Sequence, residues 1–376
     1  MIEAPPPDFD RDRWKDPRWS RWAFRNTAQF LPTLAIAPSV SPRGLVRQDR
    51  PEPEGWRGFL EATYATSAVL ICDGHIVADW PAGAIEDSGP HMLFSVTKSI
   101  VGLTARMLIE TGAIAADVSA SRLLPDLSAT AFGNATLADL LAMRDGVQFA
   151  ETYADPDADI HRYSRGYWRD AQGGARVQLA ALPVLPTVPG FSYRTPVADV
   201  IGAMLVAASG QRLAELIGEL LWRPMGAAHP AHFVLDTAGA EIAGAGLNAA
   251  ITDLARLALL LLDNGSRNGR QVIAQSIVAA LFEGGDRDSF ASSVPERPGW
   301  SYHDLWWHMG GGVIAALGVH GQRLIIDRDR RLVFVRTGAQ PEPDNRPFDE
   351  SHRHFLDTMR AEAADRTRFE RHIDPA

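Results

Sequence analysis

The chain has 376 residues, 46% of them hydrophobic, with a formal net charge of −9 and a sequence pI near 5.7. This length and apolar content suffice for a large core, either in one large domain or in two lobes that share a cleft. The acidic balance argues against a nucleic-acid partner, because such binding needs a basic face that displaces counterions from phosphates. Cys72 is the only cysteine, which excludes an intrachain disulfide and a thiolate metal cluster.

Residues 1–55 alternate Trp, Arg and Pro with short apolar pieces, which predicts an arm packed on the body of the protein rather than a separate domain. The first residues are Pro-rich and charged, whereas a secretory signal needs a basic start and an apolar run. No stretch reaches the roughly 18 apolar residues that suggest a membrane span. We therefore expect a cytoplasmic protein without a membrane partner.

The first strong elements follow this arm. Residues 67–80 contain two β-rich runs joined by an Asp-Gly pair, which is a strong hairpin signal. Apolar residues then recur at helical spacing from Ser95 to about Glu110, and Gly112 supplies a C-terminal stop. The sequence therefore predicts a sheet that begins near residue 67 and a helix that is buried over much of its surface.

The rest of the chain divides into a helical middle and a β-rich end. Residues 115–290 contain several helical patterns separated by Pro- and Gly-rich loops, residues 310–338 contain β-rich runs with a further hairpin, and residues 349–367 show a closing helix. Because strands occur at both ends of the chain, we expect residues 56–114 and 291–376 to form one antiparallel α/β lobe. The helical middle would be inserted into it, with the substrate cleft between the lobes.

A serine and a lysine lie three residues apart at the start of the helix that begins at Ser95. At this spacing the side chains of Ser95 and Lys98 project from one face and can touch. The helix N-terminus favours an oxyanion nearby, and a lysine in a closed apolar site loses its proton more easily. A neutral Lys98 could then accept the Ser95 proton during attack on a carbonyl. Chance occurrence of so short a motif is the alternative.

Lysine is scarce in this chain, since only Lys15 and Lys98 are lysines among 37 basic residues. Arginine cannot replace lysine where the amine must lose its proton. This favours a chemical role for Lys98. Lys15 lies in the charged N-terminal segment, where a solvated side chain is the simplest interpretation.

Tyr193 is the candidate acid. It lies in a turn, residues 189–195, that leads directly into a predicted helix, so its side chain is expected beside the cleft. A phenol near a protonatable lysine can pass a proton to the leaving group, a contribution typically worth roughly 10²–10⁴ in rate. A packing or capping tyrosine is the alternative.

Together these motifs resemble the serine β-lactamase and penicillin-binding-protein superfamily, in its class C-like esterase and 6-aminohexanoate-dimer hydrolase branch. Ser95 and Lys98 match the family's Ser-x-x-Lys, and residues 193–195 match its Tyr-x-Asn with Thr in place of Asn. Residues 316–319 are the best match to the third motif, which is usually Lys-Thr-Gly or His-x-Gly. The resemblance covers residues 20 to 360 and implies a β-lactamase-like α/β (α+β) fold, with an antiparallel sheet, terminal helices and an inserted, mostly helical lobe.

The resemblance also implies roles for individual residues. It makes Ser95 the nucleophile, Lys98 the base and Tyr193 the proton relay, and it forms the oxyanion hole from the backbone N–H groups of Ser95 and Val319. Gly318 would let the strand approach the nucleophile closely. His320 invites a Ser-His interpretation, which we do not favour because the base and acid roles are filled. Residues that would line the cleft, with a core position as the alternative for each, are Tyr153, Asn248 and either Trp306 or Trp307.

The departures from the lactamases narrow the expected substrate. Ala316 stands where a Lys or His would hold the carboxylate of a penicillin, so short amides or esters between apolar and aromatic walls are expected. We predict a serine hydrolase of short linear amides, such as 6-aminohexanoate oligomers, or of carboxylic esters, without cofactor or metal, as a monomer or homodimer. The alternatives are a carboxylesterase with little amidase activity and a non-catalytic ligand-binding protein of the same fold.

Overall fold

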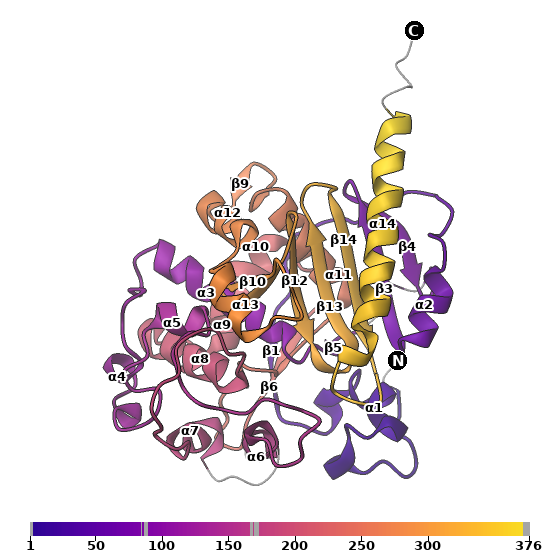
Figure 1. The fold of residues 1–376 in the computed structure, drawn as a ribbon. Helices are drawn as coiled ribbons and strands as arrows, with labels where there is room; N and C mark the ends of the chain where they lie inside the picture. The colour runs from indigo at the N-terminus through magenta and orange to yellow at the C-terminus, as the bar shows by residue number, and fades with distance from the viewer. Residues whose placement is uncertain (1–2, 84, 86–88, 166–167, 169–172, 371–376) are drawn as a thin grey trace.

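A computed structural model describes residues 3–83, 85, 89–165, 168 and 173–370, so the end of the predicted sheet lobe, 371–376, lies outside the described residues. The helices of this part are α1 (Pro17–Ala23), α2 (Trp56–Ala62), α3 (Val96–Glu110), α4 (Ala120–Leu123), α5 (Leu137–Leu141), α6 (Asp159–Arg165), α7 (Gly174–Ala180), α8 (Thr195–Ser209), α9 (Leu213–Ile217), α10 (Arg223–Met225), α11 (Ile251–Leu262), α12 (Gln275–Glu283), α13 (Arg287–Ser293) and α14 (Asp349–Glu370). Figure 1 shows the long α14 crossing one face of the central sheet.

The central sheet has eight strands among the described residues. In spatial order these are β10 (Ser301–His303), β11 (Trp306–Gly310), β12 (Val313–Gly318), β13 (Gln322–Asp327), β14 (Leu332–Gly338), β3 (Ala65–Cys72), β4 (His75–Trp80) and β2 (Val46–Arg47). All neighbours are antiparallel except β2 and β4. The two ends of the chain meet where β14 pairs with β3, which confirms the predicted antiparallel sheet built from both termini.

The predicted hairpin at residues 67–80 is present. Asp73 and Gly74 link β3 to β4 with φ angles of 47° and 85°, the left-handed conformation that a tight two-residue turn requires. The helix predicted from Ser95 is α3, and Gly112 follows its end with a φ of 72°.

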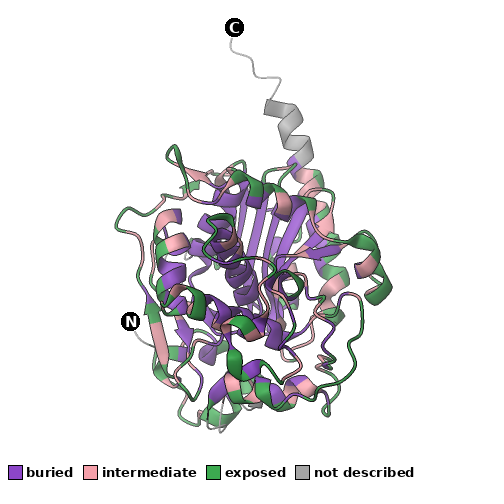
Figure 2. Ribbon diagram, turned by 90° about the vertical axis from the view of Figure 1, so that its left-hand side faces the viewer, coloured by how far each residue is buried: buried purple, intermediate pink, exposed green. Residues whose placement is uncertain are grey.

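Helices cover both faces of this sheet. On one face α3 packs against β11, β12 and β13, and α11 packs against β3, β13 and β14. On the other face, α2 and α14 pack their apolar side chains, including Trp56, Phe355 and Met359, against inner residues such as Phe334. Figure 2 shows the sheet and the helix behind it as the buried centre of the molecule. Helix α3, which follows Ser95, therefore lies deep in the core, where packing fixes its position.

The N-terminal arm, residues 1–55, is integrated into the sheets of the body, which the sequence did not indicate. Its strand β1 (Thr33–Ile36) joins a second sheet with β6 (Ala231–Val234), β7 (Leu247–Ala249) and β5 (His91–Met92), in the order β1-β6-β7-β5, and a small ribbon pairs β8 (Ser266–Arg267) with β9 (Arg270–Gln271). Trp14, Trp19 and Trp22 of the arm are buried. The arm thus packs on the body and contributes strands to both larger sheets.

The predicted helical lobe, residues 115–290, is less uniform than its sequence pattern. Helices α4, α5, α7 and α9 gather around α8, which packs on α3. Helix α11 belongs to the same predicted range but lies on the central sheet. Every residue from Ile251 to Leu262 is buried, and a helix with no exposed face needs cover on all sides. Strands β6 and β7 also fall within this range.

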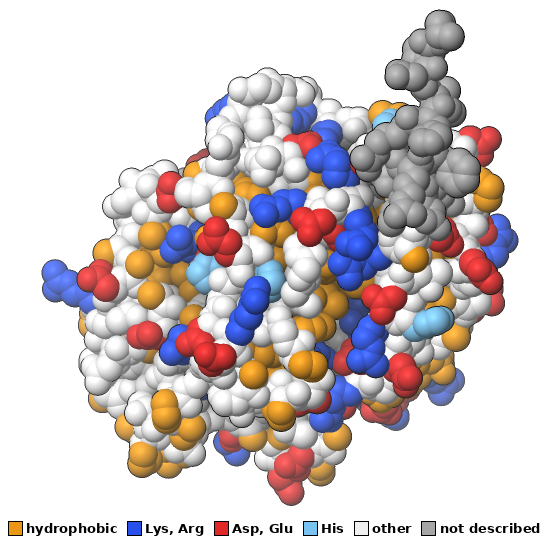
Figure 3. Space-filling model, turned by 45° about the horizontal axis from the view of Figure 1, so that its top comes forward, with side chains coloured by type: hydrophobic (Ala, Val, Ile, Leu, Met, Phe, Trp, Pro, Cys, Tyr) orange, Lys and Arg blue, Asp and Glu red, His pale blue; other side chains and the backbone are white. Residues whose placement is uncertain are grey.

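The described part of the chain contains no single helix long and apolar enough to cross a membrane. Only the pair Thr195–Ser209 and Leu213–Met225 passes a test of length and composition, with an 81° bend between the two. On the face drawn in Figure 3, acidic and basic side chains are interspersed rather than gathered by sign.

Gly102 lets α3 approach the backbone at Asp304 closely, and a substitution of this glycine tests the packing. A Cβ at Gly102 would lie 2.1 Å from the backbone oxygen of Asp304, so Gly102→Ala must move the backbone around Asp304. We expect a loss of about 1–3 kcal/mol in the free energy of unfolding, measured by urea denaturation. Gly58→Ala in α2 is the control, because a Cβ there meets nothing within 4 Å and a helical alanine should leave stability unchanged or raise it. Equal stability of the two variants would contradict this packing.

Candidate active site

Ser95 stands at the first turn of α3, directly after a strained residue. Phe94 has a φ of 46°, an unusual backbone conformation for a bulky side chain. Phe94 is held by aromatic contacts with Phe24, at 4.9 Å between ring centroids, and with the Trp14 ring, at 6.2 Å and nearly parallel. The arm and the core therefore fix the sharp turn from which the Ser95 side chain enters the cleft.

Lys98 is buried beneath Ser95, with 1% of its surface exposed. Its Nζ donates hydrogen bonds to Ser95 Oγ at 2.8 Å and to the carbonyl oxygen of Gly244 at 2.7 Å. Burial lowers the pKa of Lys98 to about 8, although the nearby carboxylates of Glu151 and Asp199 act in the opposite direction. A substantial fraction of this lysine is therefore neutral in mildly alkaline solution and able to accept a proton.

Two buried carboxyl groups flank Lys98. Glu151 Oε1 accepts hydrogen bonds from Thr195 Oγ1 at 2.6 Å and from the Tyr153 hydroxyl at 3.1 Å, and the Thr195 backbone N–H also donates to this carboxylate. Asp199 in α8 accepts the Tyr163 hydroxyl at 2.8 Å and the Gly244 N–H at 2.8 Å. Burial raises the pKa of both, that of Asp199 to about 6. Through these hydrogen bonds, Glu151 and Asp199 fix the positions of the residues that surround Lys98.

Arg194, the residue after Tyr193, anchors the turn that carries Tyr193. Arg194 forms a buried ion pair with Asp145 at 2.7 Å and donates to the backbone oxygens of Met143, at 3.1 Å, and Val147. Thr195, which replaces the family's Asn, is engaged by Glu151. The start of α8, and with it the turn that carries Tyr193, is therefore fixed to residues 143–151.

Tyr193 lies between Lys98 and Trp307. Lys98 Nζ is 5.3 Å from the centroid of the Tyr193 ring, and Trp307 from β11 stacks on that ring at 5.2 Å and 25°. Burial, together with the charge of Glu151, raises the pKa of Tyr193 well above its usual value, while a hydrogen bond with Ser95 acts in the opposite direction. The phenol is therefore protonated at neutral pH and suited to donate a proton.

The end of strand β12 approaches the chain just before Ser95 at Gly318, the position where the sequence analysis expected a close approach. A Cβ on Gly318 would lie 2.5 Å from the backbone oxygen of Leu93, two residues before Ser95. Asn345 donates from Nδ2 to the Gly318 carbonyl at 2.8 Å and so steadies the end of the strand. The backbone of Val319 then follows beside Ser95, where a donor for a developing oxyanion is needed.

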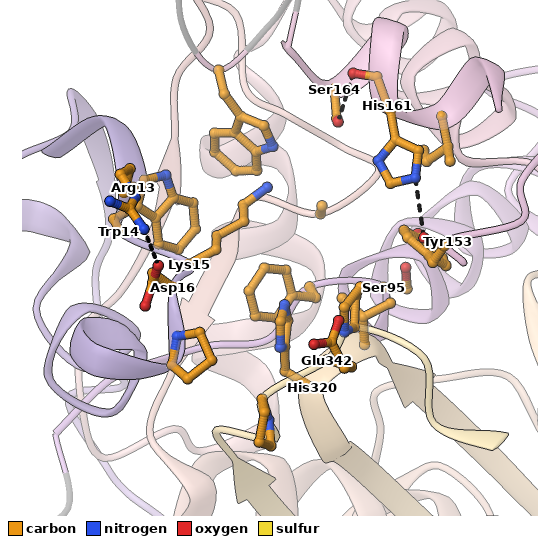
Figure 4. Close-up of a pocket in the computed structure, with 18 of the residues that line it drawn as sticks. Arg13, Trp14, Lys15, Asp16, Ser95, Tyr153, His161, Ser164, His320 and Glu342 are labelled. Atoms are coloured by element: carbon orange, nitrogen blue, oxygen red, sulfur yellow. Dashed lines mark hydrogen bonds and ion pairs between the residues drawn. The ribbon is translucent and has the colours of Figure 1, made fainter. Parts of the chain in front are cut away.

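Ser95 lies on the boundary of two cavities, which also share Tyr153, Val319 and Pro343. The larger, about 500 Å³, is lined by residues of the N-terminal arm and by Phe94, Trp168 and His320 (Figure 4). The smaller, about 220 Å³, is lined by Tyr193, Trp307, Gly318 and several charged side chains. A substrate whose scissile bond lies at Ser95 can therefore extend in two directions.

Residues 316–319, which match the third motif, contain no basic side chain, but arginine side chains line the smaller cavity. Arg297 and Arg323 both bind Asp349, at 2.7 and 3.0 Å, and Arg346 binds Asp344 at 2.6 Å. These guanidinium groups are already paired with carboxylates of the protein. The expected weakness toward penicillin-like substrates therefore stays a prediction.

The structure brings most of the predicted site residues together, but not all of them. Tyr153 and Trp307 line the cavities, whereas Trp306 is a core residue whose Nε1 donates to the Ser99 carbonyl at 2.9 Å. Asn248 lines neither cavity: it is buried in β7 and exchanges hydrogen bonds with Thr27 and Gly246. The core alternative therefore holds for Asn248, which the resemblance had placed in the cleft, and its partners lie in the arm and two residues before it.

His320 is near the site but is held by the fold. Its Nδ1 is 2.8 Å from the Gln340 carbonyl oxygen, its ring packs on Phe94, and burial lowers its pKa to about 4. These contacts agree with the preference for Lys98 as the base. Among the described residues, no group of three or more His, Cys, Asp or Glu side chains is placed to hold a metal ion.

Three neighbours of Lys98 were missed by sequence reasoning. Glu151 lies two residues from Tyr153, which the sequence analysis named as a cleft residue, and Gly244 contributes through its backbone carbonyl oxygen. Asp199 lies in the helix after Tyr193. A search for acidic residues beside the predicted site segments would have found Glu151 and Asp199, whereas the Gly244 carbonyl gives no side-chain signal.

The buried Lys98 forms a hydrogen bond with Ser95 at the start of a helix, and this helix packs against an antiparallel sheet. This arrangement is that of a serine hydrolase of the β-lactamase type. The model of the Beta-lactamase family matches residues 59–356, so the chain belongs to this family. Over 357 residues it is 27% identical to a 6-aminohexanoate-dimer hydrolase from Paenarthrobacter ureafaciens, with 89% of each chain covered.

Solved structures share the fold. A protein from Bacillus anthracis, provisionally assigned as a 6-aminohexanoate-dimer hydrolase, superposes with a TM-score of 0.84 at 24% identity and covers 97% of this chain and 99% of its own. A family VIII carboxylesterase superposes with a TM-score of 0.56 at 15% identity, over 80% of this chain and 94% of its own. These likenesses confirm the β-lactamase-like fold expected from the sequence.

Proposed function

We propose that this serine hydrolase cleaves short linear amides and esters through an acyl-enzyme on Ser95. The observation that carries the proposal is the 2.8 Å contact between Lys98 Nζ and Ser95 Oγ, made by a buried lysine whose pKa is lowered to about 8. A lysine in this state can serve as a base at a pH where an exposed lysine stays charged.

In the acylation step, neutral Lys98 takes the proton of the Ser95 hydroxyl as Oγ forms a bond to the substrate carbonyl carbon. The carbonyl oxygen becomes negative and is stabilised by the backbone N–H groups of Ser95 and Val319. When this intermediate collapses, the bond to the leaving group breaks and Tyr193 gives that group a proton, which Lys98 replaces. Water then attacks the acyl-enzyme by the same route in reverse and releases the acid.

The shape of the site supports a linear substrate. Two cavities of about 500 and 220 Å³ meet at Ser95, so chains on either side of the scissile bond have room. Aromatic side chains, including Trp14, Trp168 and Trp307, form much of the walls and suit methylene chains. The relative named as a 6-aminohexanoate-dimer hydrolase supports the same class of substrate, and the carboxylesterase neighbour makes ester cleavage the companion activity.

Three substrates test this proposal on the purified full-length chain. We expect turnover of a p-nitrophenyl short-chain ester and of the linear 6-aminohexanoate dimer, and little turnover of nitrocefin, a chromogenic β-lactam. The ratio of kcat/KM between ester and amide then decides between an amidase and a carboxylesterase. Turnover of none of the three, with or without stoichiometric acylation, would contradict the proposal and favour the binding-protein alternative.

Tyr193→Phe tests the assigned proton donor. We expect kcat for the amide to fall by about 10²–10⁴, because an amine is a poor leaving group unless it is protonated. The p-nitrophenyl ester should be affected much less, since p-nitrophenolate leaves without a proton. Tyr302→Phe is the matched control: Tyr302 packs 6.1 Å from Tyr193 but lines neither cavity at Ser95. Equal losses with both substrates would contradict the proton-donor role.

A further inference from the structure

We propose that Asn345 is a positioning residue for the oxyanion hole: its side-chain amide orients the peptide group that carries the Val319 N–H. This inference rests on the proposed function, in which that N–H stabilises the oxyanion formed at Ser95. The carbonyl of Gly318 and the N–H of Val319 belong to one planar peptide group, which is trans. The two groups therefore point in opposite directions, so a residue that holds the Gly318 oxygen also sets the direction of the Val319 N–H.

Asn345 contacts the turn that carries Val319 at both ends. Its Nδ2 donates to the Gly318 carbonyl oxygen at 2.8 Å, and its Oδ1 accepts the backbone N–H of Gly321 at 3.0 Å. Because one partner is an acceptor and the other is a donor, these contacts fix which way the amide faces. Asn345 is half-buried and lies between β14 and α14, 27 positions along the chain from Gly318. Its side chain thus bridges the turn from outside.

The other peptide groups of this turn are held separately. Gln322 is buried, and its Nε2 lies 3.3 Å from the Val319 oxygen and 3.2 Å from the His320 oxygen. The same Nε2 donates to the Gly338 carbonyl oxygen at 2.8 Å and so ties the turn to β14. These contacts support His320, whose φ of 59° is unfavourable for a non-glycine residue. Among the described residues, Asn345 is the side chain that binds the peptide group of the Val319 N–H.

The hydrogen bond from Asn345 also makes the Val319 N–H a stronger donor. Donation to the Gly318 oxygen polarises the peptide group, so the N–H on its other side becomes more positive. A negative oxyanion gains more from this donor than a neutral carbonyl oxygen does, because charge-assisted hydrogen bonds are stronger. The contribution of Asn345 therefore belongs to the transition state, and its loss should lower kcat rather than raise KM.

Two substitutions of Asn345 test this role. Asn345→Asp can still accept the Gly321 N–H but cannot donate to Gly318, and Asn345→Leu has a similar size without the added charge. Removing an oxyanion donor typically costs about 10²–10³ in turnover, so we expect a donor that is only displaced to cost about tenfold in Asn345→Leu. The factor should be the same for ester and amide, with KM nearly unchanged. The loss should be larger in Asn345→Asp, whose carboxylate adds a negative charge to the cavity at Ser95.

The carbonyl band of the acyl-enzyme reports on the oxyanion hole without turnover. The protein is acylated with the p-nitrophenyl ester of a bulky, slowly hydrolysed acid that carries an isotopic label in its carbonyl carbon. Infrared difference spectroscopy then identifies the labelled band. Hydrogen bonds to the acyl oxygen weaken the C=O bond and lower the frequency of its stretch. We expect a higher frequency in both Asn345 variants than in the wild type.

Asn345 also lines the smaller cavity, so direct contact with the substrate is the alternative role. Binding of N-hexylhexanamide, a neutral linear amide, to the Ser95→Ala protein distinguishes the two. A positioning role predicts nearly the same Kd with and without Asn345→Leu, measured by calorimetry, because no oxyanion forms in this complex. A Kd that rises by the same factor as kcat/KM falls would overturn the positioning role.

Asn26→Leu is the matched control. Asn26 is also half-buried, its Nδ2 donates to the Trp22 carbonyl oxygen at 2.9 Å, and it lines neither cavity at Ser95. This variant should keep the wild-type kcat and carbonyl band. Wild-type values in both Asn345 variants, or an equal change in Asn26→Leu, would overturn the inference. Failure of the hydrolase proposal would appear separately, as a wild type that neither turns over the substrates nor becomes acylated.

Discussion

Ser95→Ala is expected to lower kcat/KM for esters and amides by about 10³–10⁶, the range seen when a catalytic nucleophile is removed. The reason is geometric: the Ser95 hydroxyl lies at the junction of two cavities and contacts the only base that the proposed reaction uses, Lys98. Removing the Oγ removes the atom that forms the acyl bond. Turnover of a p-nitrophenyl ester followed at 400 nm measures the loss.

Ser99→Ala is the control for this variant. Ser99 lies one helical turn along α3 and is buried, but its Oγ donates to the Leu305 carbonyl at 2.7 Å and faces neither cavity. We expect a stability loss of about 1 kcal/mol from the missing hydrogen bond and nearly unchanged kcat/KM. Full activity in Ser95→Ala, or an equal loss in both variants, would contradict the nucleophile assignment.

Lys98→Met should lower kcat/KM by a similarly large factor, about 10³ or more, because Ser95 then has no base. Lys98→Arg should not restore activity, since a guanidinium does not release its proton in this pH range. In the wild type, kcat/KM should rise with pH and level off, with a midpoint near the Lys98 pKa of about 8. The sign follows from the neutral amine being the active form of Lys98.

Glu151→Gln tests the same assignment from a neighbouring residue. The Glu151 charge raises the pKa of Lys98, so its removal should move the midpoint of the pH profile to lower pH. The amide side chain can still accept the Thr195 hydroxyl, so the wall is disturbed as little as a substitution allows. A wild-type profile without an ascending limb between pH 6 and 10, or a midpoint that moves upward in Glu151→Gln, would contradict Lys98 as the base.

The sequence alone predicted those features that depend on residues close together in the chain. The Ser95–Lys98 contact depends only on helical spacing, and the hairpin at residues 67–80 depends on its Asp-Gly turn, so both could be derived from the sequence. The antiparallel sheet followed from strands at both ends of the chain. The first two features need no knowledge of which distant segments meet, whereas the sheet required the further inference that strands from the two ends of the chain pair with each other.

Long-range contacts set the limit of the sequence prediction. Glu151 reaches Thr195 across 44 positions, and Lys15 lines the larger cavity only because the arm packs on Phe94 through Trp14. Asn248 looked like a cleft residue but pairs with Thr27, 221 positions away. Such partners are chosen by the tertiary packing. The sequence places Glu151 beside a predicted site segment, but no spacing or composition indicates which distant residue its side chain contacts.

Trapping the acyl-enzyme tests the central claim most directly. The wild type is mixed with a p-nitrophenyl ester of a bulky, slowly hydrolysed acid, quenched in acid within seconds, and analysed by intact mass and by peptide mapping. The account predicts one added acyl group, located on Ser95, and its absence in Ser95→Ala. Turnover without any adduct, or an adduct on a residue other than Ser95, would contradict it.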